Sequence, residues 1–484
     1  MKNVRPLICA VLIGAVALAA GAQDKPKLDP GVAKALAGIR GSEAYAYVER
    51  MASPEFAGRY TGHEGYTAAA RWAAGLFKKW GLKPVDPKTG YLLPYPSPYT
   101  VIRAAEMTLV APDGKTETKL EPNVDFLPLF YTDAGSAEAG MVFAGWGISA
   151  PELNYDDYAG LDVTGKFVLC FRGQPDRTDT RFYYYDEHRT RMKTAKDKGA
   201  VGLIYIYPSP ISNPNGEWQK DFFPAMISEK IGDAILNEIG STSAELKKAL
   251  TAFKRPIGFP LKSVIRMKVE ADYHPDGIGY NIAGYVEGSD PALRRDVLVI
   301  GGHFDHNGLH MGFLYPGADD NASGSATVME IARAFAGLSR KPKRSVVFVL
   351  FGGEEMGLQG SIYYADHPPA IFPKIDAMFN YDMTGAGDGA WGSTTEENLR
   401  KVFLDADRHV GILRGMRVVQ GPPGVRGSDQ ASFRVKGIPV ASVGANGPSL
   451  AYHETGDTIY RINPSIMGDI AKLSFLAAHA WADR

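Results

Sequence analysis

The sequence is poor in cysteine and has no excess of charge of either sign. It holds 2 cysteines among 484 residues, and Lys and Arg (53) nearly balance Asp and Glu (54). This balance gives no electrostatic reason to expect nucleic acid or an anionic membrane as a partner. A disulfide framework is excluded, because Cys9 lies in a leader-like N-terminal run and only Cys170 remains. Cys170 stands in an apolar run, which predicts a buried and inert thiol.

One apolar run has the features of a targeting segment. Lys2 and Arg5 precede an apolar stretch from Pro6 to Ala19, and the small residues of 20–22 follow it. This order predicts a secretory signal peptide over 1–22 and a protein exported to the periplasm or beyond the cell. The run is short for a membrane span, so we expect no stable membrane insertion.

The rest of the chain is long enough for more than one domain, and 45% of it is hydrophobic. Spacing of apolar residues predicts helices over 32–51, over 64–80 and from Pro464 to Ala482, the last with Asn463 as its N-cap. From about 281 onward, strand-like and helix-like stretches alternate to the end. This pattern indicates an α/β fold.

Five carboxylate and imidazole side chains are the most informative feature of the sequence. They are His303, Asp320, Glu355, Asp382 and His453. Four of them stand at the end of an apolar, strand-like run or in the loop after it, and Asp320 stands just before a helix-like stretch. In open α/β sheets functional groups gather at the carboxyl ends of strands, so we expect these residues to meet. Carboxylates and imidazoles without cysteine suit divalent metals, zinc above all.

The motifs around these residues occur in a recognisable order. H-x-D, D-N-x-S-G, G-E-E, N-x-D-M and Y-H-x-x-x-D-T follow one another, and together they resemble the dizinc aminopeptidase family of the clan MH metallopeptidases. The resemblance covers essentially the whole chain after the leader, including Phe56–Arg59 and Gly427–Phe433. It implies a mixed, mostly parallel sheet flanked by helices, the zinc exopeptidase fold.

The resemblance also implies a metal-binding scheme with two zinc ions per chain. His303 and Asp382 would bind one zinc, Glu355 and His453 the other, and Asp320 would bridge both. Two dications a few ångströms apart repel each other, so an anion is needed between them. The resemblance further implies a cis peptide bond between Asp320 and Asn321.

Glu354 precedes a predicted ligand and is expected to be catalytic. Hydrolysis in the resembled family uses a metal-bound hydroxide, and Glu354 would be the general base and acid. The alternative is an idle, exposed pair of glutamates at 354–355. Asp305, two residues after His303, is expected to accept a hydrogen bond from that histidine, and the alternative is an ordinary surface residue.

Other residues near the motifs are open to competing interpretations. Asp319 competes with Asp320 for the bridge, but alignment on 321–324 favours Asp320. Tyr452 would hydrogen-bond the tetrahedral intermediate, or would be a packed core tyrosine. Gln430 stands where the family often has histidine, which puts substrate contacts in doubt. His306 and His310 have no ligand counterpart in the family and are expected to be solvated loop residues.

The block from 123 to 259 resembles a protease-associated domain inserted into the catalytic domain. The matching stretches are Gly145–Ile148, 165–173 and 195–202. Residues 23–122 and 260–484 would form the catalytic domain around it. The block carries no candidate ligand and no base, so we expect it to shape substrate access, and its excision to leave the ligand set intact.

The interpretation from sequence is therefore an exported zinc aminopeptidase acting on peptides. One rival is a dizinc carboxypeptidase of the glutamate-releasing kind, which shares the ligands and needs an arginine-rich substrate pocket. A second is a receptor-like relative without activity, and a third is a single-zinc glutaminyl cyclase. The presence of all five ligand residues and Glu354 argues against the last two.

Overall fold

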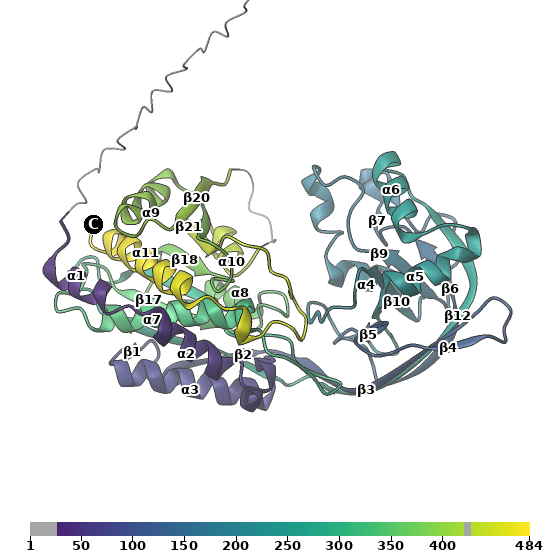
Figure 1. The fold of residues 1–484 in the computed structure, drawn as a ribbon, viewed down its shortest axis with the longest axis horizontal. Coiled ribbons are helices and arrows are strands. Elements are labelled where there is room, and N and C mark those ends of the chain that lie inside the picture. Colours follow the sequence, from purple (N-terminus) through teal and green to yellow (C-terminus); the bar gives the residue numbers. More distant parts are fainter. Residues whose placement is uncertain (1–26, 421–426) are drawn as a thin grey trace, which may run out of the picture.

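The computed structural model describes residues 27–420 and 427–484. The signal peptide expected over 1–22, with Cys9, lies outside the described residues. Among the described residues, none of the helices combines the length and the apolar character needed to cross a bilayer. The chain forms two lobes, joined at one side by long strands and separated on the other (Figure 1).

The larger lobe is built on a mixed sheet. In spatial order its strands are β1 (Lys83–Pro84), β13 (Ile278–Val286), β17 (Val346–Phe351), β14 (Asp296–His303), β18 (Lys374–Tyr381), β21 (Val440–Ala445), β19 (Ala390–Thr394) and β20 (Leu413–Val418), with β2 (Leu92–Pro96) also paired to β13. The central strands β17, β14, β18 and β21 are mutually parallel, and antiparallel pairs flank them. The predicted fold class is confirmed.

Both faces of this sheet are covered, so the middle of its central strands is apolar. Leu298 and Ile300 of β14 pack into the core on one face, and Val297 and Val299 pack into the core on the other. This alternation is the two-residue period of a strand with helices on both sides. The buried centre of the sheet is a rigid base for the residues at its carboxyl edge.

Helices cover the two faces unequally. One face is covered by α1 (Pro30–Ala37), α2 (Gly41–Met51), α3 (Glu64–Trp80), α7 (Gly324–Ala336), α9 (Glu397–Val410) and α11 (Pro464–Ala482). The other face carries α8 (Gln359–Asp366) and α10 (Gln430–Arg434). The predictions for α3 and α11 are confirmed, and Asn463 does cap α11. The single helix predicted over 32–51 is wrong, because the chain breaks at Gly38.

The smaller lobe has a second sheet and its own cores. Its strands, in spatial order, are β4 (Glu117–Lys119), β3 (Tyr99–Val110), β12 (Gly258–His274), β6 (Gly135–Ala144), β9 (Phe167–Phe171), β10 (Gly202–Tyr207), β11 (Ala225–Ser228) and β5 (Phe126–Pro128). Helices α4 (His188–Asp197), α5 (Glu229–Leu236) and α6 (Ser243–Phe253) accompany it. Cys170 of β9 is fully buried and unpaired by disulfide, as predicted.

Two long strands connect the lobes. β3 and β12 pair along most of their length and run from the larger lobe into the smaller sheet (Figure 1). The smaller sheet therefore includes residues before 123 and after 259, outside the limits predicted for the inserted block. The limits of 123 and 259 for an independently folding domain stay a prediction.

Candidate metal centre

Parallel strands bring the five predicted ligand residues to one edge of the main sheet. His303 is the last residue of β14, Asp382 directly follows β18, and Glu355 lies in the loop after β17. His453 lies in the loop after β21, and Asp320 in the turn before α7. Because β17, β14, β18 and β21 are neighbours in the sheet, their carboxyl ends meet.

The two oxygens of Asp320 face two different sets of groups. Its Oδ1 lies 3.2 Å from Nε2 of His303, which is 3.4 Å from Oδ1 of Asp382. Its Oδ2 lies 3.3 Å from Nε2 of His453, which is 3.0 Å from Oε2 of Glu355. Zinc–ligand bonds of about 2.0–2.1 Å at tetrahedral angles place neighbouring ligand atoms about 3.3 Å apart. Each set therefore has the spacing of part of a zinc coordination shell.

The unsatisfied hydrogen-bonding capacity of two ligand atoms also fits a metal site. Nε2 of His453 and Oδ1 of Asp382 are buried and have no hydrogen-bond partner. Burial opposes ionisation of Asp320, but its contacts with His303 and His453 hold the pKa of its carboxyl well below the ordinary value. The cations that balance this buried carboxylate are the imidazoles of His303 and His453, whose pKa values are raised in turn, and a bound dication would take over that role. The donor set suits two zinc ions bridged by Asp320.

The turn that carries Asp320 is fixed on both sides. Both carboxylate oxygens of Asp457 accept backbone N–H groups, from Asp319 at 2.9 Å and from Asp320 at 3.0 Å. Asn321 donates to the carbonyl of Tyr381 at 3.0 Å and accepts from the N–H of Met383 at 3.0 Å. The bridge is thereby tied to the end of β18, where Asp382 lies. The peptide bond between Asp320 and Asn321 is cis, as predicted.

Glu354 lies beside the five predicted ligand residues, which together form the cluster, and it borders an open cavity. Ligand-type atoms of His303, Glu354 and Glu355 lie within 4.8 Å of one another. Burial raises the pKa of Glu354 well above its ordinary value; the nearby carboxylates of Glu355 and Asp429 raise it further, while His303 opposes them. A raised pKa suits a carboxylate that must accept and return a proton near neutral pH.

Asp305 is buried behind Glu354, so the surface alternative does not hold. Its Oδ1 accepts the backbone N–H of Glu354 at 3.2 Å. Nδ1 of His303 lies 3.3 Å from the backbone carbonyl of Asp305 and 3.8 Å from its Oδ1. Asp305 thus positions the loop of Glu354, and its predicted hydrogen bond from His303 stays a prediction.

His306 and His310 are fully buried, so the prediction that they are solvated is wrong. The loop after β14 turns inward beneath the cluster. Nδ1 of His306 lies 2.8 Å from Oε1 of Glu355, which orients that carboxylate. The ring of His310 packs 4.3 Å from that of Phe130, away from the cluster. Their position after a strand that ends in a ligand was a sequence signal for burial.

Arg59 braces the site, a role that its motif did not predict. The side chain is fully buried and donates to backbone carbonyls on both sides of the cluster, at Phe304 (2.8 Å), Pro316 (2.8 Å) and Gly317 (2.9 Å). Burial lowers the pKa of Arg59 to about 10, so it stays charged at neutral pH. It fixes the loops after His303 and before Asp320 while placing positive charge near four acids.

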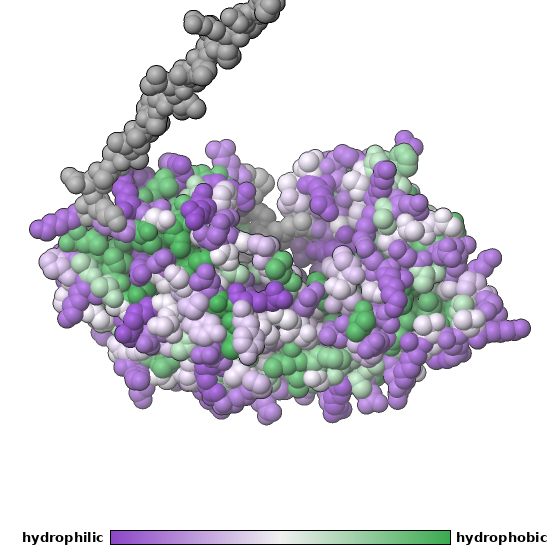
Figure 2. Space-filling view, in the orientation of Figure 1, coloured by the Kyte–Doolittle hydropathy of each residue, from purple (hydrophilic) through white to green (hydrophobic). Residues whose placement is uncertain are grey.

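The cluster opens into a cavity of about 1080 Å³ between the lobes. The surface is hollowed between them (Figure 2). Tyr452, 47% exposed, stacks on His453 with ring centroids 3.8 Å apart and borders the cavity, so the alternative of a packed core tyrosine is wrong. Gln430 accepts from Asn380, two residues before Asp382, at 2.8 Å. Gln430, which stands where the family often has histidine, therefore supports the end of strand β18.

The smaller lobe contacts the cluster directly, which the sequence did not predict. Nδ1 of His453 lies 2.8 Å from the carbonyl oxygen of Ser212, and the N–H of Ser212 donates to the carbonyl of His453 at 3.0 Å. Excision of 123–259 would remove both hydrogen bonds. That excision leaves the ligand set intact therefore stays a prediction, and these two contacts weigh against it.

Comparisons with known proteins agree with the fold. Residues 281–478 match the model of peptidase family M28, and residues 111–235 match that of the PA domain. Leupeptin-inactivating enzyme 1 of Streptomyces exfoliatus is 29% identical over 210 residues, 39% of this chain and 45% of that protein. A probable leucine aminopeptidase of Arthroderma otae is 30% identical over 193 residues, 38% of this chain and 53% of that protein. The matches thus span about half the length of these curated relatives or less.

The fold is shared with a solved structure over nearly the whole length of both chains. The aminopeptidase from Aneurinibacillus sp. strain AM-1 superposes with a TM-score of 0.65 at 21% identity, covering 94% of this chain and 96% of that one. Residues 281–478, in the larger lobe, are thus similar to peptidase family M28, and residues 111–235, mostly in the smaller lobe, are similar to the PA domain. We refer to the smaller lobe as the PA module.

Proposed function

We propose that this protein is an exported dizinc aminopeptidase that removes N-terminal residues from peptides. One observation carries the proposal: the two oxygens of Asp320 face separate histidine–carboxylate pairs beside an open cavity. Zinc ions held by these residues would supply a Lewis acid for the scissile carbonyl and an activated water at neutral pH. The names of relatives that are leucine aminopeptidases support the same class.

The residues of the chain would divide the remaining work. Glu354, poised by its raised pKa, would accept the proton of the attacking water and return it to the leaving amine. The carboxylate of Asp305 would hold Glu354 in place by accepting a hydrogen bond from the backbone N–H of Glu354. From the rim of the cavity, the hydroxyl of Tyr452 would donate a hydrogen bond to the oxygen of the tetrahedral intermediate.

The cavity wall near Glu354 suits an apolar residue at the N-terminus of the substrate. Leu358 and Ile362 border the cavity from the side of α8, and Val435 does so from the end of α10. Ile362 and Val435 are 45% and 46% exposed, which leaves apolar surface for a substrate side chain to cover. We propose that this wall receives the residue that is removed.

The charged residues that line this cavity do not favour the rival interpretation, a dizinc carboxypeptidase. Among the residues that the structure describes, the Lys and Arg side chains that line it are already engaged: Arg172 with Asp186, Arg189 with two backbone carbonyls, Lys193 with Asp197 and Lys436 with Asp366. A pocket for a glutamate-like terminus needs cations free to pair with carboxylates. The receptor-like alternative is disfavoured because the five ligand residues and Glu354 are brought together.

Export is proposed on the strength of residues 1–22, whose order of charged, apolar and small residues is that of a signal peptide. The protein would act in the periplasm or outside the cell, on peptides. The near-neutral charge balance offers nothing to hold nucleic acid.

A peptide library tests the proposed activity. The purified protein is incubated with mixed peptides, with and without a chelator, and mass spectrometry shows which end shortens. We expect loss from the amino end, abolished by the chelator and restored by zinc. Loss from the carboxyl end would replace the proposal by the rival carboxypeptidase, and no cleavage by protein loaded with two zinc ions would contradict both.

A further inference from the structure

The two histidines of the cluster differ in what holds their second ring nitrogen. Nδ1 of His303 lies 3.3 Å from the backbone carbonyl of Asp305 in its own lobe. Nδ1 of His453 lies 2.8 Å from the carbonyl of Ser212 in the PA module. Both His453 and Ser212 are buried. A histidine of one lobe is thus oriented by the main chain of the other.

The contact at Ser212 is reciprocal. The N–H of Ser212 donates to the carbonyl of His453 at 3.0 Å, so the module contacts both the side chain and the backbone of this residue. His453 has a φ of 57°, a left-handed conformation that is uncommon outside glycine. Such a conformation persists where surrounding contacts fix it. Ser212 supplies two of those contacts.

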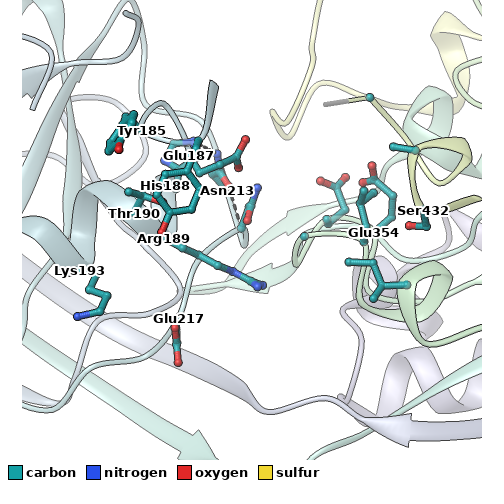
Figure 3. Close-up of a pocket in the computed structure, with 18 of the residues that line it drawn as sticks. Tyr185, Glu187, His188, Arg189, Thr190, Lys193, Asn213, Glu217, Glu354 and Ser432 are labelled. Atoms are coloured by element: carbon teal, nitrogen blue, oxygen red, sulfur yellow. Dashed lines mark hydrogen bonds between the residues drawn. The ribbon is translucent and has the colours of Figure 1, made fainter. Parts of the chain in front are cut away.

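A second contact reaches the loop that carries Glu355. Nη2 of Arg189, in α4 of the module, donates to the carbonyl of Met356 at 2.5 Å, and its Nε donates to the carbonyl of Gly216 at 3.1 Å. In Figure 3 the side chain of Arg189 extends from the module wall of the cavity toward the wall that holds Glu354. Met356 directly follows Glu355 in the chain. The same arginine therefore joins the loop after Ser212 to the loop of a predicted ligand.

We propose that Arg189 and the segment 208–217 of the PA module position the metal site formed by His453 and Glu355. Docking of the module would control the occupancy of that ion more strongly than that of the ion at His303 and Asp382, because in the loop after His303 the module contacts Asn307 and His310 and no predicted ligand. This inference rests on the proposed dizinc function. The partner of the second nitrogen fixes the tautomer and orientation of a ligand histidine, and its loss typically lowers metal affinity 10–100-fold.

The Arg189→Met variant of the full-length chain tests the inference. Methionine keeps an unbranched apolar stem but removes both hydrogen-bond donors. Zinc-loaded protein is mixed with excess chelator, and release is followed with a zinc indicator. We expect two phases in the unmodified chain, and in Arg189→Met an acceleration of one of them by up to the roughly 10–100-fold usual for losing a direct outer partner of a ligand. The variant Asp382→Asn, which should accelerate the other phase, assigns each phase to its site.

Lys193→Met is the matched control. Lys193 lies on the same helix, borders the same cavity and pairs with Asp197 of its own module at 2.6 Å. Its replacement removes a cation without breaking an interlobe hydrogen bond, so both release phases should keep their rates. Arg189→Lys, which keeps the charge but has no planar fork to reach two carbonyls, should fall between Arg189→Met and the unmodified chain.

The outcomes separate this inference from the proposed function. Fewer than two zinc ions in the unmodified chain would overturn the dizinc proposal itself. Two zinc ions with unchanged release in Arg189→Met would overturn only the role of the module. Equal acceleration of both phases would overturn it as well, because a general loss of stability, visible as a lowered Tm of the metal-free variant, would then explain the effect.

Discussion

The two halves of the metal cluster are built differently. The half around His303 and Asp382 is carried by the buried carboxyl ends of two adjacent strands of one sheet. The half around Glu355 and His453 is carried by two longer loops, and the PA module completes it through Ser212 and backbone contacts. Ligands of similar chemistry can therefore have different support. A sheet edge fixes its residues through local packing, whereas a loop needs a partner from elsewhere in the chain.

The largest expected effect comes from removing the group that the two halves share. Asp320→Ala takes away the bridging carboxylate and leaves each ion with one histidine and one carboxylate. We expect zinc content to fall from two ions to near zero and hydrolysis to fall to background, as measured by elemental analysis and an anilide assay. Retention of one tightly bound zinc with substantial activity would show that Asp320 does not bridge.

A smaller loss is expected when both halves stay intact and only the base is changed. Glu354→Gln keeps the size of the side chain and removes proton transfer, so kcat should fall roughly 10²–10⁴-fold. Zinc content should stay at two. Glu355→Gln is the comparison, since it should lose the ion on the His453 side. If Glu354→Gln lost zinc while Glu355→Gln kept it, the two glutamates would have the opposite roles.

The half around His303 should respond to a change within its own lobe. Asp305→Ala removes a carboxylate 3.8 Å from Nδ1 of His303 and the acceptor of the Glu354 N–H. Zinc affinity on that side should fall by less than the roughly 10–100-fold usual for losing a direct outer partner, because the backbone carbonyl of Asp305, 3.3 Å from Nδ1, remains. Two-site zinc titration should show no change on the His453 side. A loss confined to the His453 side would reverse the comparison.

The smallest effect is expected at Tyr452. Its hydroxyl would stabilise the tetrahedral intermediate, but the side chain is 47% exposed, so water can partly replace it. Tyr452→Phe should lower kcat roughly tenfold, below the 10²–10³-fold usual for a dedicated oxyanion donor, with KM and zinc content unchanged. An unchanged kcat would leave Tyr452 only the role of packing on His453.

The part of the fold predicted best from sequence has strong local signals. The helix over 64–80 follows from its apolar spacing and from Gly81, which ends it in the left-handed conformation. The final helix follows from Asn463 and Pro464. The break between α1 and α2 was missed because Gly38 and its neighbours do not interrupt the apolar pattern enough to predict it.

The sequence motifs predicted the ligand residues of the site but not the groups that support them. The five residues do gather, because each follows or precedes an element whose place in the sheet the sequence pattern indicates. The supporting groups were missed. Arg59 lies more than 200 residues in sequence from the carbonyls of Phe304, Pro316 and Gly317, and Ser212 lies as far from His453. Ser212 also acts through its backbone, which leaves no signature in residue type.

Zinc-edge anomalous diffraction from crystals of the zinc-loaded protein tests the central claim most directly. We predict two anomalous peaks per chain, one bounded by His303, Asp382 and Asp320 and the other by His453, Glu355 and Asp320. In the second, Nδ1 of His453 should remain within hydrogen-bond distance of the Ser212 carbonyl. A single peak, or a second peak bound by His306 in place of His453, would contradict the account.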